Sequence, residues 1–526
     1  MTSIFALLWA TEIFVVQYVT LTRTYDPHWL AAKTAVRFSL DLAFVTTCVM
    51  VLPRAVLAVV AVAAVPVNLA LVAYCHYFHE TLSYSVVASS WQEGAGVAGF
   101  GAALVPWPAW ILLGLSLVAK LLLLRAAGGG TLPRRLRAAT GLACVGFYIA
   151  VLVGLNQTNI KFANVRRCMA SSDLMVTYGY SPAWIAEFVY FSDDTLLEHA
   201  LAQRRISSDK LTPIERHVEL PRRVVVVQVE SLGYSIVGHS AAGKEITPFM
   251  NRLRATSALY RIRAIHYTCS ANADFAMLNA VEPSRQMVPY KIPGYPYGDA
   301  LPHLLGGRGY RTVALHGMSG AFFARAPAYQ QMGFSQRLFR EQLCIECGAR
   351  LTNSIVADRD VFEISARLLE ATTEPVFHFI TTMSSHGPFR YIKPDEAEIY
   401  PSPSGVRQHY LNSMRYVDNA LRDYFERLPK GTLVVVYGDH PANVARDEFA
   451  ADYSGAAEYV PCFIHVTGEN LATRQETRGR PVATDGSLSL IDVANYLRTS
   501  AGCRSSLETN RSDGLAKRDR PGRRAL

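Results

Sequence analysis

The stretches RRVVVVQVES at residues 222–231 and TLVVVYGDH at residues 432–440 each join a valine-rich run to acidic side chains. Continuous apolar runs are typical of parallel strands that are covered on both faces. Open α/β sheets bind their ligands beyond the carboxyl ends of such strands. We therefore expect Glu230, Asp439 and His440 to meet at one sheet edge, where carboxylates and an imidazole suit zinc or manganese. Taken singly, Glu230 could be a helix cap and Asp439-His440 an ordinary turn.

The first 157 residues contain long apolar stretches with very few charged residues. Each stretch is close to the ~20 residues that a helix needs to cross a bilayer. The first lacks a basic start and a small-residue cleavage site, which indicates a retained anchor. We expect about five spans, of which the second and third could form one bent hairpin around Pro53-Arg54. The expected spans are residues 4–21, 38–52, 56–74, 107–124 and 136–155.

Lysine and arginine in short loops predict the orientation, because such loops stay in the cytoplasm. Four arginines lie in or beside the loop between the fourth and fifth spans, whereas residues 79–106 contain neither lysine nor arginine. The first loop is therefore predicted to be cytoplasmic and the second external. An odd number of spans then places everything after Leu155 outside the cytoplasm. Arg23, Lys33 and Arg37 in the first external loop count against this orientation.

Beyond the apolar region, stretches typical of strands and helices alternate, which indicates an α/β sheet with helices on both faces. The expected strands are residues 224–229, 258–266, 311–315, 376–381, 432–437 and 460–466. The expected helices are residues 248–256, 300–308, 358–372 and 404–428, with another from residue 273. We expect a transmembrane domain (1–157), a juxtamembrane connector (158–215) with an amphipathic stretch at 182–201, an α/β catalytic domain (216–502) and a disordered basic tail (503–526).

The formal net charge is +9. Much of the excess lies in the predicted cytoplasmic loop and in the tail, so we expect a surface facing anionic lipid rather than a nucleic-acid partner. Cys344 and Cys347 form a C-x-x-C pair. Without a second pair this is a poor zinc site, and a local disulfide is favoured over redox catalysis.

The segment HYTCSANADF at residues 266–275 leaves an expected strand and enters an expected helix. It places Thr268, Cys269 or Ser270 near a helix N-terminus, where the helix dipole and free N–H groups favour anions. A hydroxyl bound to a cation there loses its proton more easily and is a candidate nucleophile. Ser270 could instead simply cap the helix.

Three further polar residues are candidates for binding a substrate. His316 and His386 each follow an expected strand, although a single histidine in that position is more often structural. Arg325 could be an ordinary surface charge, or its guanidinium could hold a phosphate through paired hydrogen bonds.

Several short motifs occur in order between residues 224 and 466. They are Val-Glu-Ser at 229–231, Thr247-Pro248, Gly309-Tyr310, His316-Gly317, Asp358-Arg359-Asp360, Ser385-His386-Gly387-Pro388 and Tyr437-Gly438-Asp439-His440. Together with the apolar N-terminal region, this order resembles the membrane-anchored phosphoglycerol transferases of the alkaline phosphatase and sulfatase superfamily. That group includes lipoteichoic acid synthases and periplasmic glucan phosphoglycerol transferases. Lipid A phosphoethanolamine transferases are more distant relatives.

The resemblance implies that Glu230, Asp439 and His440 bind metal and that the nucleophile hydroxyl is the fourth ligand. In the family the nucleophile is usually a threonine followed a few residues later by Glu-Phe. Aligning that pair with Asp274-Phe275 makes Ser270 the nucleophile and metal ligand, with Thr268 as the fallback.

The resemblance also implies roles for the remaining candidates. His386 would assist the leaving group or bind substrate, and His316 and Arg325 would hold the head-group phosphate. Phe323 stands where the family has a tryptophan, so head-group recognition can differ. The formylglycine signature of arylsulfatases, Cys or Ser followed by x-Pro-x-Arg, is absent after Cys269.

These features predict a multi-pass enzyme of the bacterial inner (cytoplasmic) membrane, with its catalytic domain in the periplasm or outside. It would transfer phosphoglycerol or phosphoethanolamine from a membrane phospholipid to an envelope glycan or glycolipid through a covalent phospho-enzyme. One alternative is an extracytoplasmic phosphodiesterase that uses water as the acceptor. Another is a non-catalytic membrane regulatory protein. A transporter is disfavoured because the spans contain very few charges.

Overall fold

The computed structural model describes residues 2–158 with gaps at 25–33, 79–80, 91–100 and 127–132, short pieces between 175 and 201, and residues 220–502. Further gaps fall at 285–286, 455–456 and 470–487 and at a few shorter positions. The chain forms two compact units, Met1–Ala202 with Ser284–Val288 and Gln203–Pro283 with Pro289–Leu526. The predicted basic tail lies outside the described residues.

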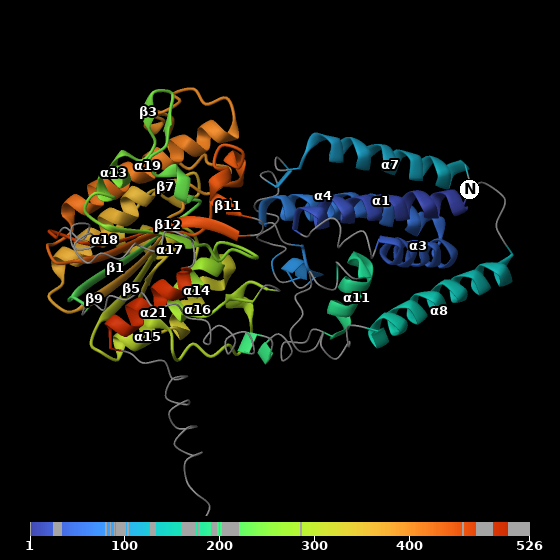
Figure 1. Cartoon of the computed structure of the whole chain (residues 1–526), viewed down its shortest axis with the longest axis horizontal. Helices are drawn as coiled ribbons and strands as arrows, with labels where there is room; N and C mark the ends of the chain where they lie inside the picture. The colour runs from blue at the N-terminus through green and yellow to red at the C-terminus, as the bar shows by residue number, and fades with distance from the viewer. Residues whose placement is uncertain are drawn as a thin grey trace, which may run out of the picture. The chain divides into compact units, whose positions relative to one another are not determined.

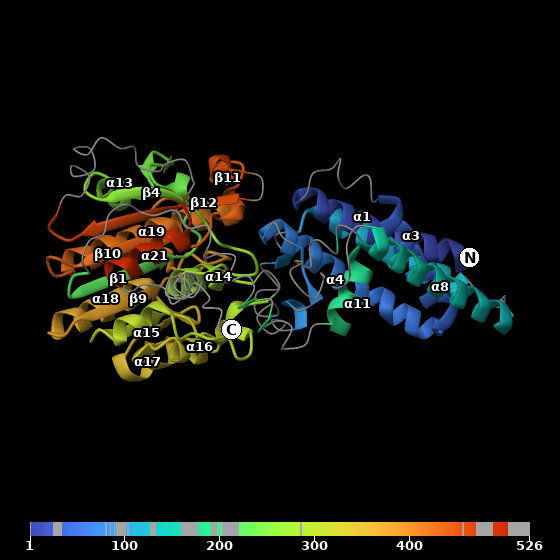
Figure 2. The same ribbon diagram turned by 60° about the horizontal axis from the view of Figure 1, so that its bottom comes forward.

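The first unit is built from long apolar helices (Figures 1 and 2). The described residues contain 4 helices long and apolar enough to cross a membrane, and these confirm the first four expected spans. They are α1 (Thr2–Thr24), α3 (Thr34–Val51), α4 (Arg54–Phe78) and α7 (Trp107–Ala126). The fifth expected span coincides with helix α8, Arg134–Thr158, whose side chains are described as far as Ala150.

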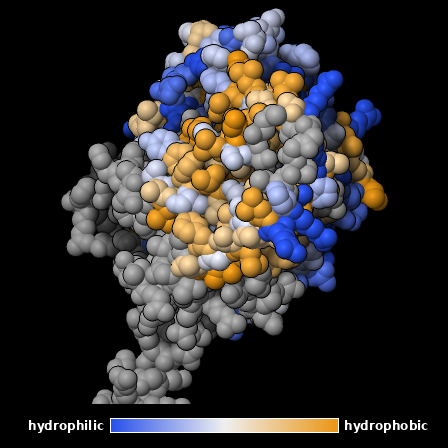
Figure 3. Space-filling view, turned by 90° about the vertical axis from the view of Figure 1, so that its right-hand side faces the viewer, coloured by the Kyte–Doolittle hydropathy of each residue, from blue (hydrophilic) through white to orange (hydrophobic). Residues whose placement is uncertain are grey.

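Leu52 and Pro53 separate helices α3 and α4. Proline cannot donate the backbone hydrogen bond that a helix interior needs. Arg37, expected in the first external loop, instead lies on α3 and is buried. Large apolar side chains are exposed on the outer surfaces of the helices, for example Val59 and Leu115. Figure 3 shows apolar side chains over much of the face that it presents. Such a surface fits contact with lipid.

Helix α11, Tyr180–Tyr190, covers part of the amphipathic stretch expected in the connector. Its polar side chains bind the helices of the first unit. Ser181 Oγ donates to Asp41 Oδ1 across 3.0 Å, and Trp184 Nε1 donates to the carbonyl oxygen of Leu82 across 3.1 Å. Helix α11 is therefore packed against residues of the first unit.

The second unit contains one mixed sheet whose strand order is β11-β12-β10-β1-β9-β5-β6, with β4 paired to β12. The central strands β10, β1, β9, β5 and β6 run parallel, and β12 is antiparallel to both β10 and β4. The strands are β1 (Arg223–Val229), β4 (Ala258–Arg263), β5 (Arg311–His316), β6 (Gln336–Leu338), β9 (Val376–Thr381), β10 (Leu433–Gly438), β11 (Tyr453–Ser454) and β12 (Ala457–Val466). Four central valines of β1 are at most 1% exposed, as expected for a strand covered on both faces.

Helices cover both faces of this sheet, with α13, α18 and α19 on one side and α14, α15 and α21 on the other (Figure 1). The predicted α/β architecture is confirmed, although β6, α16, α17 and α21 were not predicted. The helices are α13 (Pro248–Leu253), α14 (Ala271–Asn279), α15 (Leu301–Gly306), α16 (Arg325–Gln331), α17 (Arg340–Cys347), α18 (Asp358–Ala371), α19 (Val406–Arg427) and α21 (Leu490–Ser500).

Cys344 and Cys347 lie on α17 as free thiols, so the expected local disulfide is wrong for this structure. Positions three apart on a helix have Cβ atoms about 5–6 Å apart. A disulfide needs Cβ atoms about 3.8 Å apart. With this helical spacing the two cysteines stand as separate thiols in the structure.

Candidate metal centre

Two neighbouring parallel strands end at the same edge of the sheet and place two predicted ligands there. Val229 of β1 pairs with Gly438 of β10, so Glu230 and Asp439 follow the two strands side by side. The N–H of Asp439 donates to the carbonyl oxygen of Val229 across 3.2 Å. Glu230 and Asp439 are only 2% and 0% exposed. Buried carboxylates require a compensating partner.

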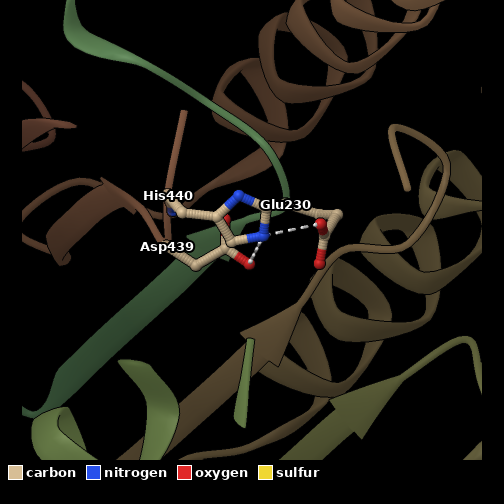
Figure 4. Close-up of side chains that lie close together, drawn as sticks. All are labelled: Glu230, Asp439 and His440. Atoms are coloured by element: carbon tan, nitrogen blue, oxygen red, sulfur yellow. Dashed lines mark hydrogen bonds and ion pairs between the residues drawn. The ribbon is translucent and has the colours of Figure 1, made fainter. Parts of the chain in front are cut away.

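Glu230, Asp439 and His440 point toward one another (Figure 4), with one ligand atom of each within 4.8 Å of the others. Nε2 of His440 lies 3.2 Å from Oε1 of Glu230 and 3.7 Å from Oδ2 of Asp439. Ligand atoms about 2.0 Å from a tetrahedral zinc ion lie about 3.3 Å from one another. The three side chains therefore have the spacing of a metal centre.

Hydrogen bonds around the cluster fix which atoms face its middle. Oδ1 of Asp439 accepts the N–H of Ser231 across 2.8 Å and the N–H of His440 across 2.7 Å. Its other oxygen, Oδ2, is buried and accepts no hydrogen bond within the described part of the chain. Nδ1 of His440 lies 3.0 Å from the carbonyl oxygen of Pro441, and donation there leaves Nε2 to bind metal. The residues present thus fit a divalent cation.

The charges of the cluster are strongly coupled. Burial raises the pKa of Asp439 well above its usual range, and the neighbouring Glu230 carboxylate raises it further. Burial lowers the pKa of His440, but Asp439 and Glu230 outweigh this and raise it to about 10. Burial raises the pKa of Glu230, yet His386 and His440 bring it below its ordinary value. A cation bound here would replace protons that the cluster otherwise holds.

Ser270 stands immediately before helix α14 and is half-buried. Its side chain makes no capping hydrogen bond, so the simple capping role is not supported. Its carbonyl oxygen lies 3.5 Å from Nε2 of Gln228, two residues before Glu230 on the same chain segment. Oε1 of Gln228 in turn accepts the hydroxyl of Tyr437 across 2.7 Å. Strands β1 and β10 therefore both contribute to holding Ser270 near the end of the sheet that carries the metal ligands.

The two alternatives to Ser270 have side chains that are less available. Thr268 is 5% exposed, and its hydroxyl lies 3.3 Å from Oδ1 of Asn272. Cys269 is buried, and burial raises the pKa of its thiol to about 12. A thiol in that state is a poor nucleophile at neutral pH. The geometry favours Ser270, whose assignment stays a prediction.

Arg325 is not a surface charge. It is 2% exposed, and its Nε donates to Oδ2 of Asp274 across 2.8 Å. The hydroxyl of Tyr329 donates to the same oxygen across 2.6 Å. Phe323, which replaces the tryptophan of the family, has its ring centroid 5.3 Å from Cζ of Arg325. The sequence did not predict the ion pair, because no local pattern links positions 51 residues apart.

His316 and His386 lie within electrostatic range of the metal ligands. Nδ1 of His316 lies 2.9 Å from the carbonyl oxygen of Thr381, and its buried Nε2 has no hydrogen-bond partner among the described residues. Burial and then Arg325 lower the pKa of His316 to about 3, and both Glu230 and His386 also act on it. The structure therefore gathers the predicted substrate-binding residues around the same edge of the sheet.

His266 also belongs to this site, although sequence reasoning gave it no role. Its ring stacks on that of His440 with centroids 3.9 Å apart and an interplanar angle of 9°. Nδ1 of His266 lies 3.2 Å from Oε2 of Glu458. One feature of the sequence could have indicated this role, namely that His266 begins the segment that leads to Ser270. The stacking confines the imidazole ring of His440 to one plane.

A mixed α/β sheet with a carboxylate and histidine centre beyond its central strands defines the class of the second unit. The family model described as Sulfatase matches residues 222–495, just over half of the chain. The chain therefore belongs to the sulfatase family, as the resemblance implied.

Two curated relatives are lipoteichoic acid synthases of Bacillus subtilis (strain 168). Lipoteichoic acid synthase 2 is 27% identical over 273 residues, which are 47% of this chain and 41% of the relative. Lipoteichoic acid synthase 1 is 25% identical over 363 residues, which are 61% of this chain and 56% of the relative. The matches thus span about half the length of these relatives.

A solved structure resembles nearly the whole chain. It is the integral membrane protein lipooligosaccharide phosphoethanolamine transferase A (EptA) from Neisseria meningitidis, with a TM-score of 0.55 and 13% identity. The likeness covers 95% of this chain and 94% of that one. At this identity it shows the fold alone, namely apolar N-terminal helices followed by the sulfatase-type domain.

Proposed function

We propose that this protein is a metal-dependent phosphotransferase. It moves a phosphoglycerol or phosphoethanolamine head group from a membrane phospholipid to an envelope glycan or glycolipid. The observation that carries the proposal is the buried cluster of Glu230, Asp439 and His440 at the end of the strand that also contacts Ser270 through Gln228. The sulfatase family and the names of the similar proteins, a lipoteichoic acid synthase and a phosphoethanolamine transferase, support the reaction class.

The reaction takes place in two displacements. Ser270 loses its proton, and its oxygen bonds to the donor phosphorus while the bond from phosphorus to the diacylglycerol oxygen breaks. Diacylglycerol leaves with one proton and the head group stays on Ser270. The acceptor hydroxyl then loses its proton and bonds to phosphorus, and the Ser270 oxygen leaves and regains a proton. Atoms and charge balance over the cycle without any oxidant or reductant.

The surrounding residues have separate tasks in this scheme. A divalent cation, zinc or manganese, would lower the pKa of the Ser270 hydroxyl and offset charge on the phosphoryl oxygens. Arg325 and His316 hold the head-group phosphate. His386 gives a proton to the leaving diacylglycerol oxygen and takes one from the acceptor.

The membrane helices bring the enzyme to its donor. A lipid donor diffuses in the bilayer, so anchoring the catalytic unit raises the effective concentration of the donor at the site. We place the protein in the bacterial inner membrane with several spans and the catalytic unit in the periplasm or outside. Arg125 near the end of α7 and the arginines at the start of α8 support this orientation.

Mass spectrometry of the full-length protein tests the proposal. The protein is incubated in mixed micelles with phosphatidylglycerol or phosphatidylethanolamine and no acceptor. The peptide that contains Ser270 should gain the mass of phosphoglycerol or phosphoethanolamine, and Ser270→Ala should abolish both this adduct and diacylglycerol release. Full diacylglycerol release by Ser270→Ala would overturn the mechanism. Head-group release that ignores added glycan would instead identify a phosphodiesterase.

A further inference from the structure

Asp358 opens helix α18 and begins the Asp-Arg-Asp motif, to which the proposed reaction gives no task. It is 1% exposed, so its carboxyl group is removed from water. Burial raises its pKa to about 6, and hydrogen bonds from Met383 and Ser384 only partly offset this effect. An acidic group that is costly to bury needs a specific partner.

That partner is the loop that follows strand β9. Oδ1 of Asp358 accepts the N–H of Met383 across 2.7 Å, and Oδ2 accepts the N–H of Ser384 across 2.9 Å. In return, the N–H of Asp358 donates to Oγ of Ser384 across 3.1 Å. Three hydrogen bonds therefore tie the start of α18 to two consecutive residues of the loop.

The same loop holds Glu230 from its other side. The N–H of Glu230 donates to Oγ1 of Thr382 across 2.9 Å, and Oγ of Ser385 donates to the carbonyl oxygen of Glu230 across 2.6 Å. The next residue is His386, whose N–H donates to the carbonyl oxygen of Met383 across 3.1 Å. The backbone of residues 382–386 is thus clamped between Asp358 and the metal ligand.

We propose that Asp358 is a positioning residue that sets the place of His386 by clamping the backbone of residues 382–386. The carboxylate does not touch the reacting atoms. It fixes the two residues before Ser385 and His386, so a small displacement there moves the imidazole relative to the leaving oxygen. This inference rests on the proposed function, because it assigns Asp358 to the proton transfer that His386 performs.

Asp358→Asn is the variant that tests the clamp. The amide keeps one oxygen for Met383 but turns an N–H toward the N–H of Ser384, so the loop must shift by tenths of an ångström. Changes to residues that orient metal ligands typically cost about 10- to 100-fold in metal affinity or activity, and we take the same range for a residue that orients His386. We expect diacylglycerol release from phosphatidylglycerol micelles by the full-length protein to lose about that much in kcat, with KM changed less than about twofold. Asp360→Asn, in the same motif but partly exposed, should retain the wild-type rate.

A double-mutant cycle separates positioning from general destabilisation. If Asp358 acts through His386, then adding Asp358→Asn to His386→Ala should slow release by less than about twofold more, because the group it positions is already gone. If the rate losses of Asp358→Asn and His386→Ala multiply in the double variant, the inference is overturned. A loss of bound metal parallel to the loss of rate would overturn it as well, because Asp358 would then only support the metal centre.

Two further variants test the clamp if Asp358→Asn cannot be studied, and separate it from the proposed function. Should Asp358→Asn fail to fold, Ser384→Ala removes only the third hydrogen bond and should reduce kcat severalfold in the same direction. An unchanged rate in Ser384→Ala would then count against the clamp. Ser270→Ala separates a failure of the proposed function from a failure of the role of Asp358. Full activity of Ser270→Ala would contradict the proposed function. An inactive Ser270→Ala together with a fully active Asp358→Asn would contradict only the positioning role of Asp358.

Discussion

Nε2 of His440 lies 3.2 Å from Oε1 of Glu230, although the two residues follow strands at opposite ends of the catalytic unit's sequence. Without a cation this contact depends on a proton on His440, which Asp439 and Glu230 favour. A divalent cation would satisfy all three side chains, including Oδ2 of Asp439, which accepts no hydrogen bond from the described residues. This relationship makes metal binding and folding stability interdependent.

Metal removal should therefore destabilise the protein. We expect metal analysis of the full-length protein to find tightly bound zinc or manganese. Chelation should lower the unfolding temperature, and the metal should restore it, because ligand at about 100 times its dissociation constant contributes about 2.7 kcal/mol. Glu230→Gln and His440→Ala should lose this metal-dependent shift in thermal unfolding. An equal shift in both variants would show that the metal binds elsewhere.

The hydroxyls of Ser270 and Thr268 should differ sharply in importance. Ser270→Ala should slow diacylglycerol release by at least about 10³-fold, because it removes the nucleophile. Thr268→Val keeps the shape of Thr268 and removes only the contacts of its hydroxyl with Asn272 and Cys269, so a loss within about tenfold is expected. The reverse order of the two losses would make Thr268 the nucleophile.

How much of the site could be predicted from sequence depended on the kind of contact. Glu230, Asp439 and His440 follow valine-rich runs, and parallel strands covered on both faces leave that pattern in the sequence itself. The ion pair between Asp274 and Arg325 joins two helices whose approach depends on the packing of the whole domain. No local periodicity records such a contact, so it could be found only in the structure.

The same distinction holds for the fold. Strands β1, β9 and β10 were predicted within one residue at each end, because their apolar runs are long and bounded by polar residues. Strand β6, Gln336–Leu338, is only three residues long and forms because β5 offers a parallel edge. Helix α17 was not predicted, because only the cysteine pair of this segment was considered in the sequence. The two cysteines lie on this helix as free thiols.

Asp274 should be needed for stability as well as for binding. Asp274→Asn leaves the buried charge of Arg325 without its counter-charge, and breaking a buried ion pair in this way typically costs about 3–5 kcal/mol. Tyr329→Phe is the matched control, because it removes one hydrogen bond to the same oxygen and should cost about 1 kcal/mol. Thermal unfolding of both variants checks the order. A larger loss in Tyr329→Phe would mean that the Tyr329 hydroxyl, not the charge of Arg325, is the main stabilising partner of Asp274.

The first unit contains its own buried ion pair. Nζ of Lys120 on α7 lies 2.8 Å from Oε2 of Glu12 on α1, and Nδ2 of Asn68 on α4 donates to Oε1 of Glu12 across 2.9 Å. These two charges of the spans are thus paired between helices. Glu12→Gln and Lys120→Met should each destabilise the full-length protein by several kcal/mol, whereas the double variant should be close to wild type.

The double variant also tests whether the membrane helices act as an anchor. If they do, diacylglycerol release by Glu12→Gln combined with Lys120→Met should stay within about twofold of wild type, as long as the protein is folded. A folded, inactive double variant would show that the pair takes part in the reaction, which is a common role for charges within membrane spans.

Asp418 on α19 should make the stability of the folded protein depend on pH. Its two oxygens accept the N–H groups of Phe249 and Met250 across 2.8 and 2.9 Å, yet burial raises its pKa from 3.8 to about 6. Between these values the folded state binds more protons than the unfolded state, so stability falls as pH rises. Its contribution is fully present below about pH 4 and lost above about pH 6.

Asp418→Asn should remove this dependence. The wild-type free energy of unfolding should fall relative to that of Asp418→Asn by about 1–3 kcal/mol between pH 4 and pH 7. Denaturant unfolding of the full-length protein at several pH values measures the difference. Asp423→Asn, with a side chain 44% exposed on the same helix, is the control and should follow wild type at every pH. A constant difference between wild type and Asp418→Asn would mean that Asp418 does not titrate in this range. The two N–H groups would then hold its carboxylate charged in spite of burial.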